Sequence, residues 1–155
     1  MKKTIRKYSV SLVAEGKVPY PVDALLDNQI TAANVLWADL NTKDREYFIV
    51  LTLNHRHRIN GYHTVAIGNL SAAIVTPPEV FLPALLDRAS AIIVGHNHPS
   101  GSPEPSKQDR KITTRLCDAG KLLGVPVLDH IIVGSGQESL HFYSFNQEGH
   151  IPQWT

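Results

Sequence analysis

The feature that most constrains the fold is the run EYFIVLTL at residues 46–53. After the opening glutamate, its apolar, β-branched and aromatic residues do not alternate with polar ones. A strand with one solvated face alternates, whereas a strand that is apolar on both faces is covered on both. The run therefore predicts a central, buried strand of a sheet that carries other elements on its two sides.

The rest of the chain alternates between helical and extended patterns. Helices are expected at residues 23–40 (in one or two pieces), 79–89 after Pro77-Pro78, and 106–123, which Gly124 would end. Strands are expected at 4–14, 58–67, 90–95, 125–133 and 139–145, a turn at 54–57 with Asn60-Gly61 as a rival turn, a loop at 96–105, and a tail at 146–155. These patterns predict an α/β fold, a mixed sheet flanked by helices, in a single domain over residues 1–155, with an N-terminal strand and helix at about 1–40.

Charge and cysteine content exclude several classes of function. The formal net charge is +1, so no overall field favours nucleic acid or an anionic membrane. Cys117 is the one cysteine, which rules out an internal disulfide and favours a reducing compartment; in a helical pattern it reads as a small buried hydrophobe. The basic N-terminus lacks the apolar run of a signal peptide and no stretch suits a membrane span, so we expect a cytoplasmic protein.

Three residues have the types and spacing of a catalytic metal site. His96 and His98 follow an apolar strand and, two residues apart, can point to the same side, while Asp109 lies in the first turn of a predicted helix. Two histidines and an aspartate leave a tetrahedral zinc ion one position for water, so we expect one Zn²⁺ per chain. The alternative is that Ser106 and Asp109 form only a helix-start pair. His55 and His57 lie beside Arg56 and Arg58, which would oppose a cation, and are expected at an exposed tip.

The same residues resemble a known signature. His96-x-His98, seven residues, Ser106, two residues and Asp109 match the spacing of JAMM metallopeptidases, and the wording HNHPSG together with LDHIIVG at 128–134 resembles the RadC family of bacterial JAB-domain proteins. The similarity covers about residues 46–145, with one departure: Pro78 is followed directly by Glu79, where the family usually has Pro-Arg-Glu. The resemblance implies the JAB/MPN (cytidine-deaminase-like) architecture.

The resemblance also implies roles for residues that spacing alone does not select. Glu46 would be the carboxylate that takes a proton from the water and passes it to the leaving amine. Ser106 would donate its hydroxyl to the oxyanion that forms at the reacting carbonyl. Asp129 and His130 match the family's sequence motif, but the resemblance assigns them no role. They either support a metal ligand or form a hydrogen-bonded pair in the core.

The implied function is a zinc metallopeptidase or isopeptidase that cleaves amide bonds in peptide or protein substrates, including ubiquitin-like tails. A non-catalytic MPN binding module and a DNA-repair-associated accessory or nucleic-acid enzyme of the RadC type are the alternatives. Only 45 residues precede Glu46, and they contain no glycine-centred hairpin motif, so we expect the short form without the helix-hairpin-helix region and only weak nucleic-acid binding. A zinc deaminase is excluded because it needs H-x-E and a P-C-x-x-C pair. The patterns predict no oligomeric state.

Overall fold

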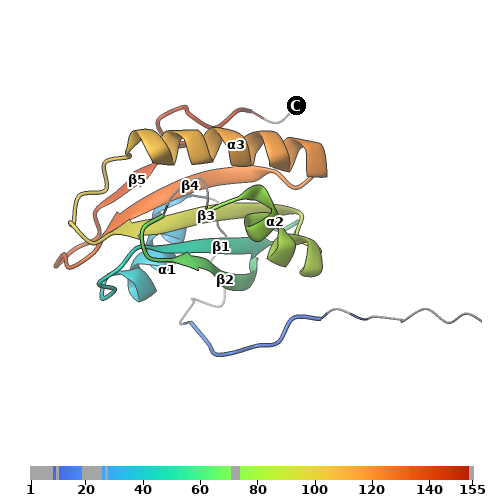
Figure 1. Ribbon diagram of the computed structural model, residues 1–155, viewed down its shortest axis with the longest axis horizontal. Coiled ribbons are helices and arrows are strands. Elements are labelled where there is room, and N and C mark those ends of the chain that lie inside the picture. The colour runs from blue at the N-terminus through green and yellow to red at the C-terminus, as the bar shows by residue number, and fades with distance from the viewer. Residues whose placement is uncertain (1–8, 10, 19–25, 27, 71–73, 154–155) are drawn as a thin grey trace, which may run out of the picture.

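The computed structural model describes residues 9, 11–18, 26, 28–70 and 74–153. Its centre is a five-stranded sheet with the strand order β2-β1-β3-β4-β5 (Figure 1). The strands are β1 (Tyr47–Leu53), β2 (Ile59–Ile67), β3 (Ala91–His98), β4 (Val127–Gly134) and β5 (Phe142–Ser144), and the helices are α1 (Gln29–Leu40), α2 (Pro77–Leu86) and α3 (Lys107–Leu123).

The sheet is mixed, as the sequence predicts. Strand β1 pairs antiparallel with β2 and β3, β3 pairs parallel with β4, and β4 pairs antiparallel with β5. A parallel pair needs a crossover connection, and the segment that contains α3 supplies it between β3 and β4. Because of this crossover, the end of β3 and the start of α3 lie close together, and that is where the candidate site forms.

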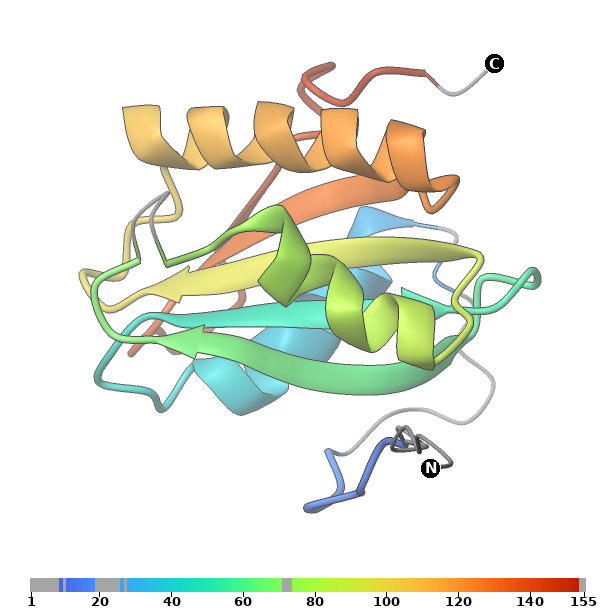
Figure 2. The same cartoon turned by 45° about the vertical axis from the view of Figure 1, so that its right-hand side comes forward.

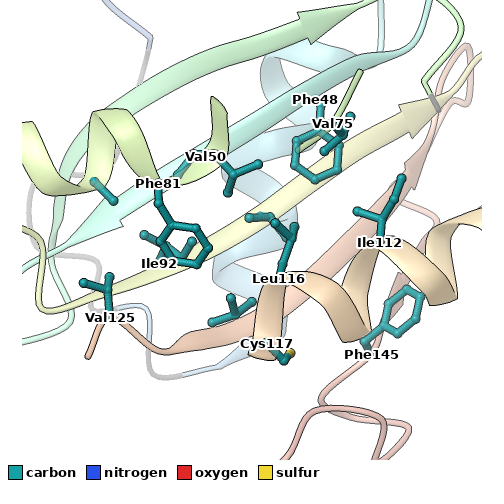
Figure 3. Close-up of a cluster of buried hydrophobic side chains, with 14 of the residues drawn as sticks. Phe48, Val50, Val75, Phe81, Ile92, Ile112, Leu116, Cys117, Val125 and Phe145 are labelled. Atoms are coloured by element: carbon teal, nitrogen blue, oxygen red, sulfur yellow. The ribbon is translucent and has the colours of Figure 1, made fainter. Parts of the chain in front are cut away.

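Helices cover both faces of the sheet, which confirms the prediction drawn from residues 46–53. Six of the seven residues of β1 are buried, and the five apolar ones among them alternate between two clusters. Phe48 and Val50 pack with α2 and α3, as Figure 3 shows, whereas Ile49 and Leu51 pack with α1. Figure 2 shows α2 in front of the sheet and α1 behind it.

The helix ends follow from local sequence. Helix α1 begins after Asn28, whose side-chain oxygen accepts a hydrogen bond from the Thr31 amide at 2.8 Å. Helix α3 begins after Ser106 and ends at Gly124, whose φ of 70° is a left-handed conformation that glycine adopts without strain. Helix α2 starts at Pro77, two residues before the predicted start, because proline is well tolerated in the first turn of a helix.

Two predicted boundaries near the site and the N-terminus are wrong. Strand β3 continues through His98, so residues 96–98 are extended rather than part of the predicted loop. They stay extended because β4 offers pairing partners as far as Gly134. The strand predicted at 4–14 is absent at residues 9 and 11–14, and its other residues lie outside the described ones; residues 23–25 and 27 of the first predicted helix also lie outside them.

Asn60-Gly61 lies inside β2, and the turn is at 55–57, where His55 and His57 are exposed as expected. The predicted tail is not a detached one: it returns to the core, and Ile151 is only 6% exposed.

Cys117 is buried, and burial, with the charge of Asp118, raises its pKa to about 11, which suits an inert thiol. Within the described ranges, no helix combines the length and apolar character needed to cross a bilayer.

Candidate metal centre

The side chains of His96, His98 and Asp109 converge between the end of β3 and the first turn of α3. The Nε2 atoms of the two histidines are 3.1 Å apart. Asp109 Oδ1 lies 3.2 Å from His96 Nε2, and Asp109 Oδ2 lies 3.5 Å from His98 Nε2. Each residue thus offers one ligand atom to a common point, with all such atoms within 4.8 Å of one another.

Backbone geometry brings the three residues together. In extended β3, His96 and His98 point to the face covered by α3, while Asn97 points to the opposite face. The loop between β3 and α3 lies close against the end of β4: a Cβ atom on Gly134 would be 2.0 Å from the carbonyl oxygen of Gly101. The glycine at 134 therefore allows the close approach by which the loop returns to the site.

The donor set and its spacing fit a zinc ion. Zinc binds imidazole nitrogen and carboxylate oxygen at ~2.0–2.1 Å, so two ligand atoms of a tetrahedral site lie about 3.3 Å apart. The observed separations of 3.1 and 3.2 Å are close to that edge length. Histidine and aspartate are also the ligand types of catalytic rather than of closed structural sites.

A chain of hydrogen bonds fixes the tautomer of His96. The Thr113 hydroxyl donates to the Asp109 carbonyl at 2.7 Å, so its oxygen is free to accept from His130 Nδ1–H at 2.6 Å. His130 Nε2 then accepts from His96 Nδ1–H at 2.9 Å. This direction places a proton on His96 Nδ1 and leaves Nε2, the atom that faces Asp109, to bind either a proton or a metal ion.

His98 is oriented in the same manner. Its Nδ1 lies 2.9 Å from the carbonyl oxygen of Ser102, which can only accept, so Nδ1 carries the proton and Nε2 is directed to the site. Both histidines thus present the nitrogen that a metal ion would bind.

The pKa shifts of His98 and Asp109 indicate that protons on the histidines interact with the Asp109 carboxylate at the place where a metal ion would bind. Burial lowers the pKa of His98, but hydrogen bonds to Asp109 and Ser102 and the charges of Asp109 and Glu46 outweigh it, so the net pKa is raised. Burial raises the pKa of Asp109, yet hydrogen bonds from His96 and His98 outweigh it and hold that pKa far below its usual range. Burial and then the charge of His96 lower the pKa of His130, which keeps this fully buried ring neutral.

Asp129 and His130 combine the two roles left open by the sequence. The buried Asp129 carboxylate accepts from the Ser144 hydroxyl at 2.6 Å and from the Asn146 amide at 2.9 Å, so it ties residues 144–146 to β4. Burial raises the pKa of Asp129 to about 6 although these bonds lower it. Phe145, held in this segment, stacks on His130 with ring centroids 4.9 Å apart. Asp129 is therefore a structural anchor, whereas His130 contacts a candidate ligand directly.

Glu46 immediately precedes β1 and lies on the same side of the sheet as the histidines. The β1–β3 register pairs Phe48 with His96, and continuing it by two residues sets Glu46 opposite His98. Its carboxylate accepts a hydrogen bond from the Leu70 amide at 3.1 Å. Glu46 is close enough for its charge to contribute to the raised pKa of His98.

Ser106 forms a complete capping box with Asp109. Its hydroxyl donates to Asp109 Oδ2 at 2.6 Å and accepts from the Asp109 amide at 3.1 Å, and Asp109 Oδ2 accepts from the Ser106 amide at 2.7 Å. The helix-start pair and the candidate metal ligand thus share one carboxylate, so the two interpretations of Asp109 are compatible.

Sequence reasoning did not select Asn97 and Thr113. Asn97 is a fully buried polar residue between two ligand candidates, and Thr113 is one turn after Asp109 on the buried side of α3. The alternation of β3 and the helical spacing of α3 would have marked both as buried polar groups. The partners of Asn97, and the His130 partner of Thr113, lie on other segments of the chain.

Comparison with known proteins gives consistent matches. A family model described as "RadC-like JAB domain" matches residues 26–150. A UPF0758 protein of Rubrobacter xylanophilus is 43% identical over 122 residues, which are 79% of this chain and 49% of the relative. One of Alkaliphilus metalliredigens is 49% identical over 102 residues (66% and 44%), and one of Methanosarcina acetivorans is 41% identical over 117 residues (76% and 49%). The chain spans about half the length of these curated relatives.

Proposed function

The chain belongs to the RadC-like JAB domain family, and on that premise we propose that it is a zinc-dependent hydrolase that cleaves amide bonds. Peptides, or proteins with an extended tail such as ubiquitin-like ones, are the proposed substrates. The observation that carries the proposal is the convergence of His96 Nε2, His98 Nε2 and an Asp109 oxygen, with Glu46 facing His98. A single, buried cysteine also suits the reducing cytoplasm that we propose as the location.

In this proposal each residue has a defined task. His96, His98 and Asp109 would hold the ion, which supplies a polarised carbonyl and a water of lowered pKa when it is bound. Glu46 accepts the proton of the attacking water and delivers it to the nitrogen of the leaving amine. The Leu70 amide donates a hydrogen bond to the Glu46 carboxylate, which helps to hold that side chain in place for this transfer.

Ser106 is proposed as a donor to the oxyanion. Its hydroxyl donates to Asp109 Oδ2 in this structure, so it would have to turn from that oxygen towards the substrate. Only the hydroxyl proton needs to change direction, so Ser106 Oγ can still accept from the Asp109 amide and the Ser106 amide can still donate to Asp109 Oδ2.

The alternatives have less support. A binding module without catalysis does not need two histidines with fixed tautomers, an aspartate and a facing glutamate. A nucleic-acid enzyme is favoured by no feature of the site, and the names of the relatives state no activity.

The experiment has two parts, metal content and turnover. Protein purified without added metal is analysed for zinc, and zinc-loaded protein is screened against ubiquitin-like fusions with C-terminal extensions, isopeptide conjugates and nucleic acids. We expect about one zinc per chain and cleavage of an amide substrate.

Two substitutions separate the roles. Glu46→Gln should keep zinc and lower turnover by roughly two to four orders of magnitude, because the amide retains the size but not the basicity. Asp109→Ala should lose zinc and turnover together, because two histidines alone hold zinc poorly. Full zinc binding by Asp109→Ala would refute the ligand set, and near-normal turnover by Glu46→Gln would refute the assignment of the base.

A further inference from the structure

We propose that Asn97, between the two histidines, is a positioning residue that sets Glu46 against the metal centre. The inference rests on the proposed function for its catalytic meaning, but the contacts that carry it do not depend on a metal. Asn97 touches neither substrate nor ion in this scheme; it acts through the backbone on the two sides of Glu46.

The side chain of Asn97 is fully buried, and it makes three hydrogen bonds. Its Oδ1 accepts from the Tyr47 amide at 2.8 Å. Its Nδ2 donates to the Arg45 carbonyl at 2.8 Å and to Ser135 Oγ at 2.8 Å. Asn97 thus holds the peptide groups immediately before and after Glu46.

These bonds continue the sheet where its backbone ladder ends. The last β1–β3 pair is Phe48 with His96, and the next pair would be Tyr47 with Asn97. At this step the side-chain carboxamide binds the Tyr47 N–H and the Arg45 C=O in place of a backbone peptide group. A carboxamide suits this because it offers one acceptor and two donors in a plane, as a peptide group offers an acceptor and a donor.

As a consequence, the two histidines and Glu46 are all positioned by the same strand, β3. In β3, His96 and His98 point to the site, and the residue between them binds the chain that carries Glu46 from the opposite face. Any shift of β1 relative to the ligands would therefore break the hydrogen bonds that Asn97 makes to residues 45 and 47. On the other flank, Gly68 N–H donates to the Glu46 carbonyl at 2.9 Å and Leu70 N–H to its carboxylate.

Ser135 supplies both an orienting contact and a matched control. Its hydroxyl accepts from Asn97 Nδ2 and donates to the Leu40 carbonyl at 2.9 Å, so it determines which end of the carboxamide faces Tyr47. Ser135→Ala removes one of the three bonds of Asn97 in the same buried cluster but leaves the two that hold residues 45 and 47. Asn97→Ala removes all three, and Asn97→Leu does so with the same number and branching of side-chain heavy atoms if the smaller side chain impairs folding.

The first readout is independent of activity. Amide hydrogen exchange of Tyr47, measured by NMR on the zinc-loaded full chain, should be at least about tenfold faster in Asn97→Ala or Asn97→Leu than in Ser135→Ala and wild type. Zinc affinity should stay within about threefold of wild type in the three variants, because His96 and His98 are unchanged. Equal Tyr47 exchange in the Asn97 and Ser135 variants would overturn the proposal.

The second readout is turnover of an amide substrate that the wild type cleaves. Asn97→Ala should lower kcat about 10- to 100-fold with little change in KM, since misplacement of a catalytic group by about 1 Å has such an effect. In the Glu46→Gln background the same substitution should have less than a twofold effect, because the group it positions is already inactive. An undiminished loss in that background would show that Asn97 acts through general stability and would overturn the proposal.

The two proposals can fail separately. If wild type binds no zinc or cleaves no amide substrate, the proposed function fails, and the position of Glu46 is then judged from Tyr47 exchange alone. If wild type is active and the Asn97 and Ser135 variants keep equal kcat, the proposed function stands and the role of Asn97 is refuted.

Discussion

At the scale of single residues, the site depends on which nitrogen of each histidine carries a proton. His96 donates from Nδ1 only because His130 accepts, and His130 accepts only because Thr113 takes its other proton. All of these groups are buried, so no water can substitute for a missing partner without entering the core. Groups that orient a ligand in this manner commonly contribute one to two orders of magnitude to metal affinity.

Thr113→Val should therefore weaken zinc binding about 10- to 100-fold. The change keeps the side-chain shape but leaves the Nδ1–H of His130 without its acceptor, so the ring can turn and release His96. Competition with a chromophoric zinc chelator measures the affinity. Thr114→Val is the matched control, because the adjacent hydroxyl binds only the Arg110 carbonyl on the exposed side of α3 among the contacts described. Equal zinc affinities in the two variants would contradict the role of the Thr113–His130 pair.

Zinc binding should also depend on pH through His98. Its pKa is raised in the metal-free protein, so the proton on Nε2 contributes stability to that state at low pH, and this contribution is lost as the pH rises through the raised value. Zinc must displace this proton. We expect an apparent affinity that is flat above the raised pKa and falls by about tenfold per pH unit below it.

Glu46→Gln tests the cause of that dependence. The substitution removes one of the charges that raise the pKa of His98, so the pH at which affinity begins to fall should move to a lower value. Zinc titrations followed by isothermal calorimetry at several pH values measure both curves. Coincident curves would mean that Glu46 does not influence His98.

At the scale of elements, α3 begins with a carboxylate that serves the helix and the site together. Ser106→Ala should lower the free energy of unfolding by about 1 kcal/mol, the usual contribution of an N-cap, and should also weaken zinc binding because Asp109 loses a hydrogen bond that orients it. Asn28→Ala removes the cap of α1, far from the site in sequence and on the other face, and should cost similar stability without affecting zinc. Urea unfolding and zinc titration of both variants make the comparison. A zinc affinity unchanged by Ser106→Ala would separate the cap from the metal site.

Elements with a strong internal pattern could be predicted from the sequence. The run of β1 that is apolar on both faces is a property of that strand's own residues. The Ser106 and Gly124 signals of α3 likewise lie at the ends of that helix, and the structure confirms these predictions. The end of β3 could not be predicted, because its last three residues are extended only through their pairing with β4. Pattern alone likewise could not show that Asn60-Gly61 continues a strand.

The residues of the candidate site also divide into those that the sequence could indicate and those that it could not. His96, His98 and Asp109 lie within one short segment, and their types and spacing alone indicate a candidate metal site, whereas the catalytic role of Ser106 came from the family resemblance. Glu46 required a family resemblance, since a charged residue before a buried strand is usually a solvated edge. The contacts of Asn97 and His130 depend on strand register, and their partners are 50 and 34 residues away in the chain.

At the scale of the whole molecule, charge is balanced but unevenly placed. The exposed side of α3 carries five cationic residues, Lys107, Arg110, Lys111, Arg115 and Lys121, and one exposed acid, Asp118. With a net charge of +1, we expect this chain to bind duplex DNA with a Kd weaker than about 1 µM at physiological salt, and with little sequence preference.

Fluorescence anisotropy with duplex DNA at several salt concentrations tests this expectation. Lys107→Ala with Lys111→Ala should reduce the residual binding and its salt dependence, because both side chains lie on the cationic side of α3. Submicromolar binding at physiological salt would contradict the prediction and favour a nucleic-acid function.

The crossover between β3 and β4 has a consequence for the order in which the molecule matures. The three candidate ligands lie within residues 96–109, whereas Glu46 joins them only when β1 pairs with β3, a contact between residues about 50 positions apart. Local contacts form with a smaller loss of chain entropy than distant ones. If the chain is the metal-dependent hydrolase proposed above, its candidate ligands should therefore be able to come together before Glu46 reaches them, so that metal binding would precede catalytic competence during folding.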